Sequence, residues 1–102
     1  MIRHIVLWRL KSIDQFETIR DALEAQLGRI PGLLHVEVGR SINPGRRAAD
    51  FARICDFENE AALTAYHQHP VHKETRAIVD PLVSEHWIAD YHTLTSMRSA
   101  KT

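Results

Sequence analysis

The sequence predicts an α+β domain whose elements follow the order β-α-β-β-α-β, the ferredoxin-like arrangement. Three observations lead to this prediction. Four segments are rich in β-branched and aromatic residues, and two stretches with apolar residues at helical spacing separate them. The length of 102 residues leaves room for a single domain. We therefore expect a four-stranded antiparallel sheet with both helical regions on one face.

The first half of the chain contains two strands and the first helix. Ile2–Leu10 has no helix or strand breaker and predicts a strand that is apolar on both faces. A capping-box pattern at residues 12–15 precedes an amphipathic helix, which Gly28 and Pro31-Gly32 end. Leu33–Arg40 alternates and predicts the second strand. The apolar stripe of the helix consists of Phe16, Ile19, Leu23, Leu27 and Ile30.

The second half predicts two more strands around a broken helix. Asp50–Phe57 is the third strand, and Asn59 can cap a helix that runs to Gln68. Pro70 interrupts that helix, and a further helical piece follows over Val71–Val79. The fourth strand is Ser84–His92. We expect residues 1–93 to form the domain and residues 94–102 to form a polar C-terminal tail.

The first strand also predicts the partner of this domain. Two helices cover one face of the sheet only, yet Ile5 and Leu7 face away from His4, Val6 and Trp8. An apolar face of several strands is rarely left bare on a monomer. We therefore expect a homodimer, packed sheet on sheet into an α+β barrel, with an interface of roughly 2,000 Å² or more. The other residues expected on this second face are Leu34, Val36, Val38, Ala52 and Ile54.

Composition and charge exclude several classes of protein. Lys+Arg and Asp+Glu number 13 each, so the basic excess of a nucleic-acid binder or a polybasic membrane anchor is missing. The longest apolar runs are far shorter than the ~20 residues of a membrane-spanning helix. Cys55 is the single cysteine, and Met1 leads directly into a strand without a signal-peptide pattern. We expect a cytoplasmic protein that binds neither nucleic acid nor membranes.

A motif in the second helical region carries a resemblance to a known family. Residues 66–72 read Tyr-His-Gln-His-Pro-Val-His, and this segment resembles the Tyr-x-x-His-Pro-x-His signature of the stress-responsive dimeric α/β-barrel (Dabb) proteins. The resemblance extends over residues 1 to about 92, and it implies a homodimer in which two sheets form a central barrel. The other matching segments are Arg3-His4-Ile5-Val6-Leu7, Pro31-Gly32, Asp50–Phe57 and Asp90-Tyr91.

One branch of this family implies a reaction. A plant polyketide cyclase of the family forms olivetolic acid by intramolecular aldol condensation, and its functional histidines and a tyrosine correspond to His4, Tyr66 and His72. Its first-helix tyrosine corresponds to Leu23, which is apolar here. The resemblance thus implies a cofactor-independent lyase or cyclase with a related pocket and a different substrate.

The chemistry of these residues suits that reaction. An imidazole with an ordinary pKa near ~6.5 can act as a general base at neutral pH, and a phenol can steady it or a developing oxyanion. We therefore assign His72 as the base, Tyr66 as its helper and His4 as the residue that orients a substrate. The alternatives remain that Tyr66 is a core aromatic residue and that His4 bonds a helix carbonyl. Val6, Trp8, Leu23 and His86 are expected to line the same pocket.

Arg53 is an unusual residue of the third strand. It alternates with Phe51 and Cys55, so we expect its guanidinium to lie under the helices. A buried guanidinium is costly unless it is paired. We favour an internal partner, Glu37 on the adjacent strand; the alternative is a ligand carboxylate or phosphate, held by a bidentate contact.

The histidines of the motif also invite a metal hypothesis. His67 and His69 would lie about 200° apart on a helix, at ~100° per residue, and Pro70 changes the direction of the chain after them. Zinc requires three or four converging ligands. We expect no metal and no cofactor.

Three functions remain open. The first is a small-molecule pocket protein, either a lyase or a cyclase, and the second is a non-catalytic stress-response dimer. The third is a monooxygenase-like member of the wider dimeric barrel group. An open cavity of a few hundred Å³ onto which His4 and His72 converge would favour the first function. A site filled by Trp8, Phe51 and Leu23 would favour the second.

Overall fold

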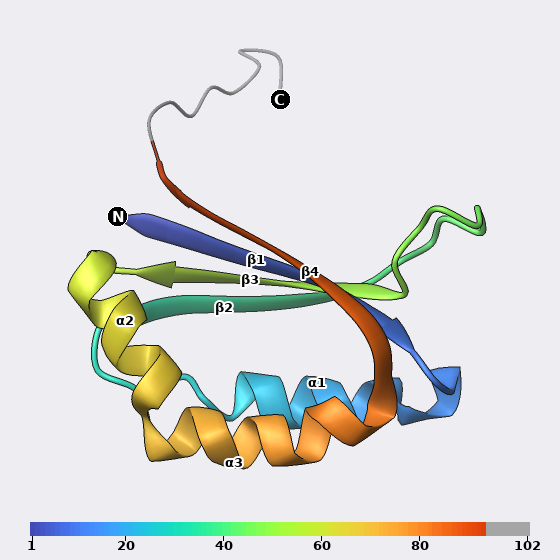
Figure 1. Cartoon of the computed structure of the whole chain (residues 1–102), viewed down its shortest axis with the longest axis horizontal. Helices are drawn as coiled ribbons and strands as arrows, with labels where there is room; N and C mark the ends of the chain where they lie inside the picture. The colour runs from blue at the N-terminus through green and yellow to red at the C-terminus, as the bar shows by residue number, and fades with distance from the viewer. Residues whose placement is uncertain (94–102) are drawn as a thin grey trace.

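The computed structural model describes residues 1–93, and its elements follow the predicted order (Figure 1). The strands are β1 (Ile2–Leu10), β2 (Leu33–Arg40), β3 (Phe51–Phe57) and β4 (Val83–His92). The helices are α1 (Phe16–Glu24), α2 (Glu60–Gln68) and α3 (Pro70–Val79), with short 3-10 helices η1 (Ile13–Gln15) and η2 (Asp80–Leu82). The predicted β-α-β-β-α-β order is confirmed, and its second helical region consists of α2 and α3.

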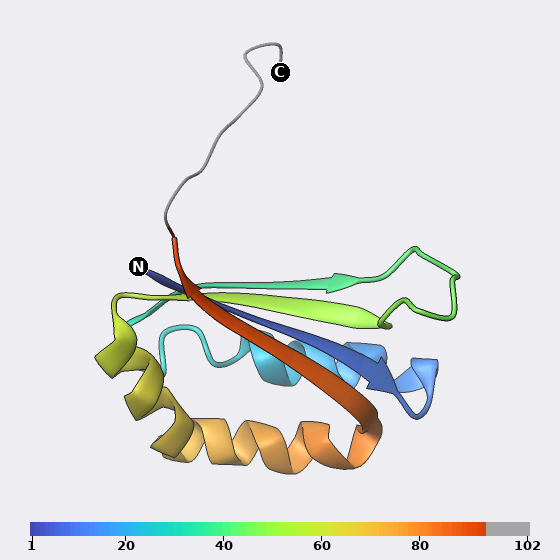
Figure 2. The ribbon, with the colours of Figure 1, turned by 45° about the horizontal axis from the view of Figure 1, so that its top comes forward.

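The four strands form one antiparallel sheet in the order β2-β3-β1-β4. The first and third strands of the sequence are therefore central, as in a ferredoxin-like fold. α1 and α3 lie side by side on one face of the sheet, and α2 lies at the end of this helical layer (Figures 1 and 2). Among residues 1–93, no helix covers the opposite face, which we call the open face.

The pairing register places an apolar patch on the open face. Successive side chains of a strand alternate between the two faces, and Ile5 of β1 lies opposite Ile54 of β3. Leu7 in turn lies opposite Trp87 of β4. The patch extends over three neighbouring strands and consists of Ile5, Leu7, Ala52, Ile54, Trp87 and Ala89.

The second strand does not contribute to this patch, and the prediction that placed its valines there is wrong. Val36 pairs with Cys55, and Val38 pairs with Arg53. Both partners are buried beneath the helices, and both valines pack against the buried core. The cause is a register irregularity near the start of β2. Leu34 lies at that irregularity and is exposed.

The first helix is shorter than its apolar periodicity predicts. α1 ends at Glu24, and residues 25–29 continue as turns in which Gly28 adopts a φ of +84°. The chain direction therefore changes before the fourth residue of the apolar stripe. Leu27, which was predicted to be buried, is 51% exposed, whereas Gln26 is fully buried.

The two predicted helix caps have different outcomes. The Ser12 side chain makes no capping hydrogen bond, so the predicted capping box is wrong. The reason is that Ser12 precedes the 3-10 helix η1, and the Gln15 backbone N–H donates to the Ser12 carbonyl. Asn59 does cap α2, because its side-chain oxygen accepts a hydrogen bond from the backbone N–H of Ala62 at 2.9 Å.

Two clusters of buried apolar side chains fill the space between the sheet and the helices. One consists of Val6, Trp8, Leu10, Phe16, Ile19, Leu23, Phe51 and Val79. The other consists of Ile2, Ile30, Leu33, Cys55, Phe57, Tyr66 and Val71. On β1 the residue between the two clusters is His4, and on β3 it is Arg53. The boundary between the two clusters is therefore formed by one polar and one charged side chain.

Two further expectations concern the ends of the chain and membranes. The predicted polar tail, residues 94–102, lies outside the described residues. Within residues 1–93, none of the helices has the length and apolar character needed to cross a membrane.

Candidate functional site

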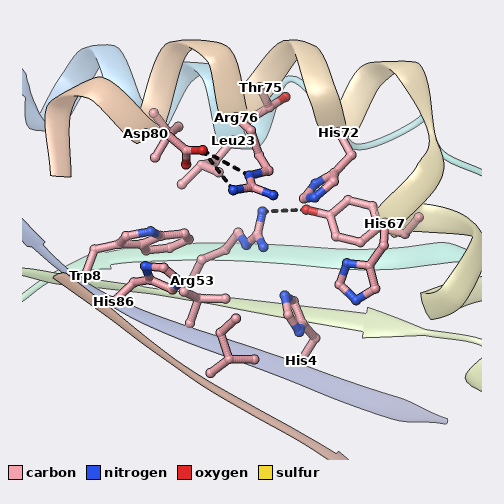
Figure 3. Close-up of a pocket in the computed structure, with 14 residues that line it drawn as sticks. His4, Trp8, Leu23, Arg53, His67, His72, Thr75, Arg76, Asp80 and His86 are labelled. Atoms are coloured by element: carbon pink, nitrogen blue, oxygen red, sulfur yellow. Dashed lines mark hydrogen bonds and ion pairs between the residues drawn. The ribbon is translucent and has the colours of Figure 1, made fainter. Parts of the chain in front are cut away.

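A cavity of about 150 Å³ lies between the sheet and the helices, next to the boundary of the two core clusters (Figure 3). Side chains from both central strands, all three helices and β4 line it. Its volume is below the few hundred Å³ that are usual for a ligand site. Trp8, which lines the cavity, stacks on Phe51 with ring centroids 4.7 Å apart, and Phe51 itself does not line it.

All eight residues predicted for the site line this one cavity: His4, Val6, Trp8, Leu23, Arg53, Tyr66, His72 and His86. Their roles remain predictions. Six further residues line it that the sequence analysis did not select: His67, Thr75, Arg76, Val79, Asp80 and Ile88. Thr75, Arg76 and Val79 follow His72 on α3 by three, four and seven positions. Helical spacing from His72 would therefore have predicted them.

His4 is held by a carboxylate from the neighbouring strand. It is buried on β1, and the register places it opposite Asp90 of β4, whose carboxylate bonds Nδ1 of the imidazole. Because a carboxylate only accepts, Nδ1 of the neutral ring carries the proton and Nε2 is left as an acceptor. Burial lowers the pKa of His4 below its ordinary value, and the bond to Asp90 opposes this shift. The partner of Nδ1 is therefore a strand carboxylate, and not the helix carbonyl that was one of the two alternatives for His4.

Arg53 reaches from β3 toward the helices, as its alternation predicts (Figure 3). Its guanidinium ends beside Tyr66 of α2. Its Nη1 donates to the Tyr66 hydroxyl at 3.0 Å and to the Oε1 atom of Gln26 at 3.1 Å. The guanidinium also lies over the Trp8 ring, 5.4 Å from its centroid, in a cation–π contact. Gln26 was not predicted, because the turn after α1 that directs it inward has no periodic signal.

The predicted ion pair between Arg53 and Glu37 is wrong. Glu37 pairs in register with Ile54, so it lies on the open face, whereas Arg53 lies under the helices. Strict alternation is the physical reason, because residues 53 and 54 are neighbours on β3 and must face opposite ways. Among residues 1–93, Arg53 forms no salt bridge.

His72 lies in the first turns of α3, beside Tyr66, and the centroids of the two rings are 4.2 Å apart. Burial lowers the pKa of the His72 imidazole to about 4, and the Arg53 charge acts in the same direction. The ring is therefore neutral at pH 7. Its Nδ1 atom is buried and has no hydrogen-bond partner within the described part of the chain.

The junction between α2 and α3 brings these two rings together. His69 ends α2 in an extended conformation and caps α3, because its Nδ1 atom accepts a hydrogen bond from the Val71 backbone N–H at 3.1 Å. Pro70 then occupies the first turn of α3. A backbone N–H at this position would have no acceptor within the helix, so its absence from proline breaks no helical hydrogen bond. Tyr66 and His72 therefore belong to different helices that meet at an angle (Figure 2).

His67 belongs to a group of neighbouring aromatic rings at the cavity. Its ring centroid lies 6.0 Å from that of His4, 5.5 Å from that of Tyr66 and 5.7 Å from that of His72. His69, by contrast, serves as the helix cap and does not line the cavity. Within residues 1–93, no group of three or more His, Cys, Asp or Glu side chains is arranged to hold a metal ion.

Sequence comparison places this architecture in a known family. The model of the stress-responsive A/B barrel domain matches residues 2–93. The chain belongs to this family. The resemblance carried by the motif at residues 66–72 is thereby confirmed for nearly the whole chain. No curated protein matches the sequence.

Solved structures related to this stress-responsive barrel domain share its fold. A dimeric ferredoxin-like protein of unknown function from Thermobifida fusca is 29% identical, with 90% of each chain covered and a TM-score of 0.80. A hydroxynitrile lyase from Passiflora edulis is 19% identical, with 95% and 96% covered and a TM-score of 0.82. SnoaB, a cofactor-independent oxygenase from Streptomyces nogalater, is 11% identical, with 96% and 97% covered and a TM-score of 0.78.

These comparisons confirm the fold class and leave the reaction open. The ferredoxin-like fold is shared by the similar structures, and some of them are enzymes whereas others have no known function. The lyase and the oxygenase are less than 25% identical to this barrel domain, so their similarity concerns the fold alone.

Proposed function

We propose that the protein is a homodimeric lyase or cyclase that needs no cofactor and removes a proton next to a carbonyl group in the cavity. The observation that carries the proposal is the pair formed by Tyr66 and His72. A neutral imidazole and a phenol lie in contact at one cavity wall, and His4 lines the same cavity from β1. This is the arrangement of a base with an oxyanion donor beside it.

The chemistry assigns one role to each side chain. His72 accepts the α proton of the substrate at its ring, and the electron pair of the broken C–H bond moves to the carbonyl oxygen. The Tyr66 hydroxyl donates a hydrogen bond to that oxygen. In a cyclisation the enolate carbon attacks a second carbonyl group, and the protonated His72 returns its proton to the new alkoxide. His4, fixed by Asp90, offers its free Nε2 to orient the substrate.

Proton removal is testable without the natural substrate. We expect the protein to accelerate exchange of the α protons of phenylacetone for deuterium in D₂O, followed by proton NMR. His72→Gln should lower this rate by about 10²- to 10⁴-fold, the usual contribution of a general base. His92→Gln is the matched control, because His92 is exposed on β4 and lies outside the cavity. Exchange in the wild type at the buffer rate would reject the catalytic proposal.

The non-catalytic alternative has one observation in its favour. The cavity volume of about 150 Å³ is smaller than that of most ligand sites. If no exchange occurs, the proposal becomes a stress-response dimer whose cavity is a gap in packing. The oxygenase alternative rests on the fold it shares with SnoaB and on no residue of this cavity.

The homodimer belongs to the same proposal. Its support is the apolar patch of the open face, on which the exposed fractions of Leu7 and Trp87 are 39% and 48%. A patch that spans three strands is unusual on a monomer. The similar protein from Thermobifida fusca is described as dimeric. A cytoplasmic location remains a prediction from the cysteine content.

A further inference from the structure

Arg53 is a buried cation without a counter-ion. The residue is 3% exposed, and both of its hydrogen bonds begin at Nη1 and end on neutral oxygens. Its Nε atom is buried and has no hydrogen-bond partner among residues 1–93, and no bond to Nη2 occurs there either. Three of the five N–H bonds of the guanidinium are therefore free to donate.

The carboxylates nearest to the cavity are already bound to other groups. Asp80 forms a salt bridge with Arg76, 3.0 Å from Nη2, and Asp90 bonds His4. Among residues 1–93, Arg53 thus forms no salt bridge with a carboxylate. Leaving a buried charge without such a partner is costly, and a charge of this kind at a cavity is a candidate group for binding a ligand.

We propose that the cavity binds a small monocarboxylate, whose carboxylate oxygens accept hydrogen bonds from Nη2 and Nε of Arg53. The apolar body of the ligand would lie against Trp8, Leu23 and Val79, which line the same cavity. This inference rests on the proposed ligand pocket and does not depend on the catalytic step.

Size and charge favour a monocarboxylate over a phosphate ester. A cavity of about 150 Å³ has room for an apolar body about the size of a benzene ring, with the carboxylate directed at Arg53, and most of its wall is hydrocarbon. Among the described residues, Arg53 is the one guanidinium of the cavity wall without a salt bridge, so the matching partner is a single carboxylate. A planar carboxylate also fits the edge of a guanidinium in a bidentate manner. A phosphate group would need further donors, such as a glycine-rich loop.

Binding of an anion at Arg53 would also change the pKa of His72, the proposed base. His72 lies among cationic and titratable groups from several elements: His4 on β1, Arg53 on β3, His67 on α2 and Arg76 on α3, with Asp80 and Asp90 as the acidic ones. The Arg53 charge contributes to the lowering of the His72 pKa. A bound carboxylate would offset that charge, so it would raise the pKa of His72 and make the imidazole a stronger base. The substrate would in this way activate its own base.

The binding test compares benzoate with benzamide, which has the same shape and no charge. We expect benzoate to bind the wild type at pH 7 roughly 10- to 100-fold more tightly than benzamide in an NMR titration, as hydrogen bonds to a charged group imply. Arg53→Met should abolish this difference. Arg20→Met is the matched control, because it removes one positive charge from the exposed surface of α1 and should leave the difference unchanged.

Each outcome separates this inference from the proposed function. If benzoate and benzamide bind with equal affinity, a ligand pocket exists and the anion inference is wrong. If neither compound binds, the ligand pocket is rejected as well. If Arg53→Met does not fold, NMR of the wild-type protein tests the inference instead. Benzoate should shift the Arg53 Nε–H resonance and raise the pKa of His72, and benzamide should do neither. Unchanged signals would overturn the inference.

Discussion

The two faces of the sheet differ in the chemistry of their central positions. The face under the helices carries His4 and Arg53 at its centre, whereas the open face carries Ile5 and Ile54 at the adjacent positions. An antiparallel sheet with one covered face normally has apolar side chains inside and polar side chains outside. In this sheet the covered face is apolar except at its centre, and the centre of the open face is apolar.

This difference separates the two proposed functions of the domain. The covered face contains the cavity proposed to bind a monocarboxylate, and the open face carries the apolar patch proposed as the dimer interface. Since neighbouring residues of one strand serve different faces, the two functions are separated by a single position along the chain. Each face can therefore be changed by substitution without replacing a side chain of the other.

The largest expected effect comes from placing a charge on the open face. Ile54→Asp would put a carboxylate at the centre of the proposed sheet-to-sheet interface. We expect it to cost about 3 kcal/mol or more of dimer stability, because an unpaired charge would be buried. Light scattering at micromolar concentration should show a dimer for the wild type and monomer or unfolded chain for the variant.

A matched control exists for this change. Ile42 is 99% exposed and lies in the connection between β2 and β3, so Ile42→Asp introduces the same charge away from the open face. It should leave the dimer intact. A wild-type monomer, or a dimeric Ile54→Asp variant, would show that the open face is not an interface.

The next largest effect concerns the packing of the covered side. Gly32 has a φ of +79°, and an added Cβ would lie 2.6 Å from the Cβ atom of Ala62 on α2. Gly32→Ala should destabilise the fold by about 2 kcal/mol or more in denaturant unfolding, because left-handed strain and a steric clash add together. The Cβ added by Gly28→Ala meets no neighbour. This variant should therefore lose only about 1 kcal/mol of stability, the cost of left-handed strain. Equal losses for both would contradict the clash.

A pH-dependent effect should come from the covered face alone. The pKa of His72 is lowered to about 4 in the folded state, against about 6.5 in the unfolded chain. Between these values the unfolded state binds more protons, so stability decreases as the pH falls from about 6.5 to 4. His72→Gln should flatten this part of the unfolding profile.

His92→Gln, on an exposed position of β4, serves as the control and should keep the wild-type slope. An NMR titration of the His72 ring gives an independent measurement. A His72 pKa near 6.5 in the free protein would show that the ring is solvated, and the description of an enclosed site would fail.

The smallest expected effect is the cost of losing Arg53. Arg53→Met removes a charge that no described carboxylate compensates, and the Tyr66 hydroxyl lies 3.5 Å from Gln26 Oε1 and can bond it instead. We expect the free energy of unfolding to stay within about 1 kcal/mol of the wild type, or to rise. A loss of several kcal/mol in urea unfolding would identify Arg53 as a structural group.

The sequence predicts the elements of this fold better than its contacts. The strands follow from alternation and β-branched residues, and the cap at Asn59 and the break at Pro70 are local signals. The end of α1, by contrast, is not predicted by a local sequence signal. The apolar stripe continues through Leu27, yet the chain turns earlier and buries Gln26.

The candidate site divides in the same way. The residues that line the cavity follow from strand alternation and from the motif at residues 66–72, but their partners do not. Asp90 meets His4 only through the register of β1 with β4, and Gln26 meets Arg53 only through a turn. The Glu37 prediction was wrong because adjacent strands alone do not specify the face.

The break between α2 and α3 explains how Tyr66 and His72, six positions apart in the motif, can be in contact. On one continuous helix, residues 66 and 72 would be separated by about 9 Å along the axis and would point about 120° apart. Their rings could not touch. In this protein the chain bends at His69 and Pro70, and the ring centroids lie 4.2 Å apart. A homologue that kept the tyrosine and the histidine on an unbroken helix would possess both residues and lack the pair.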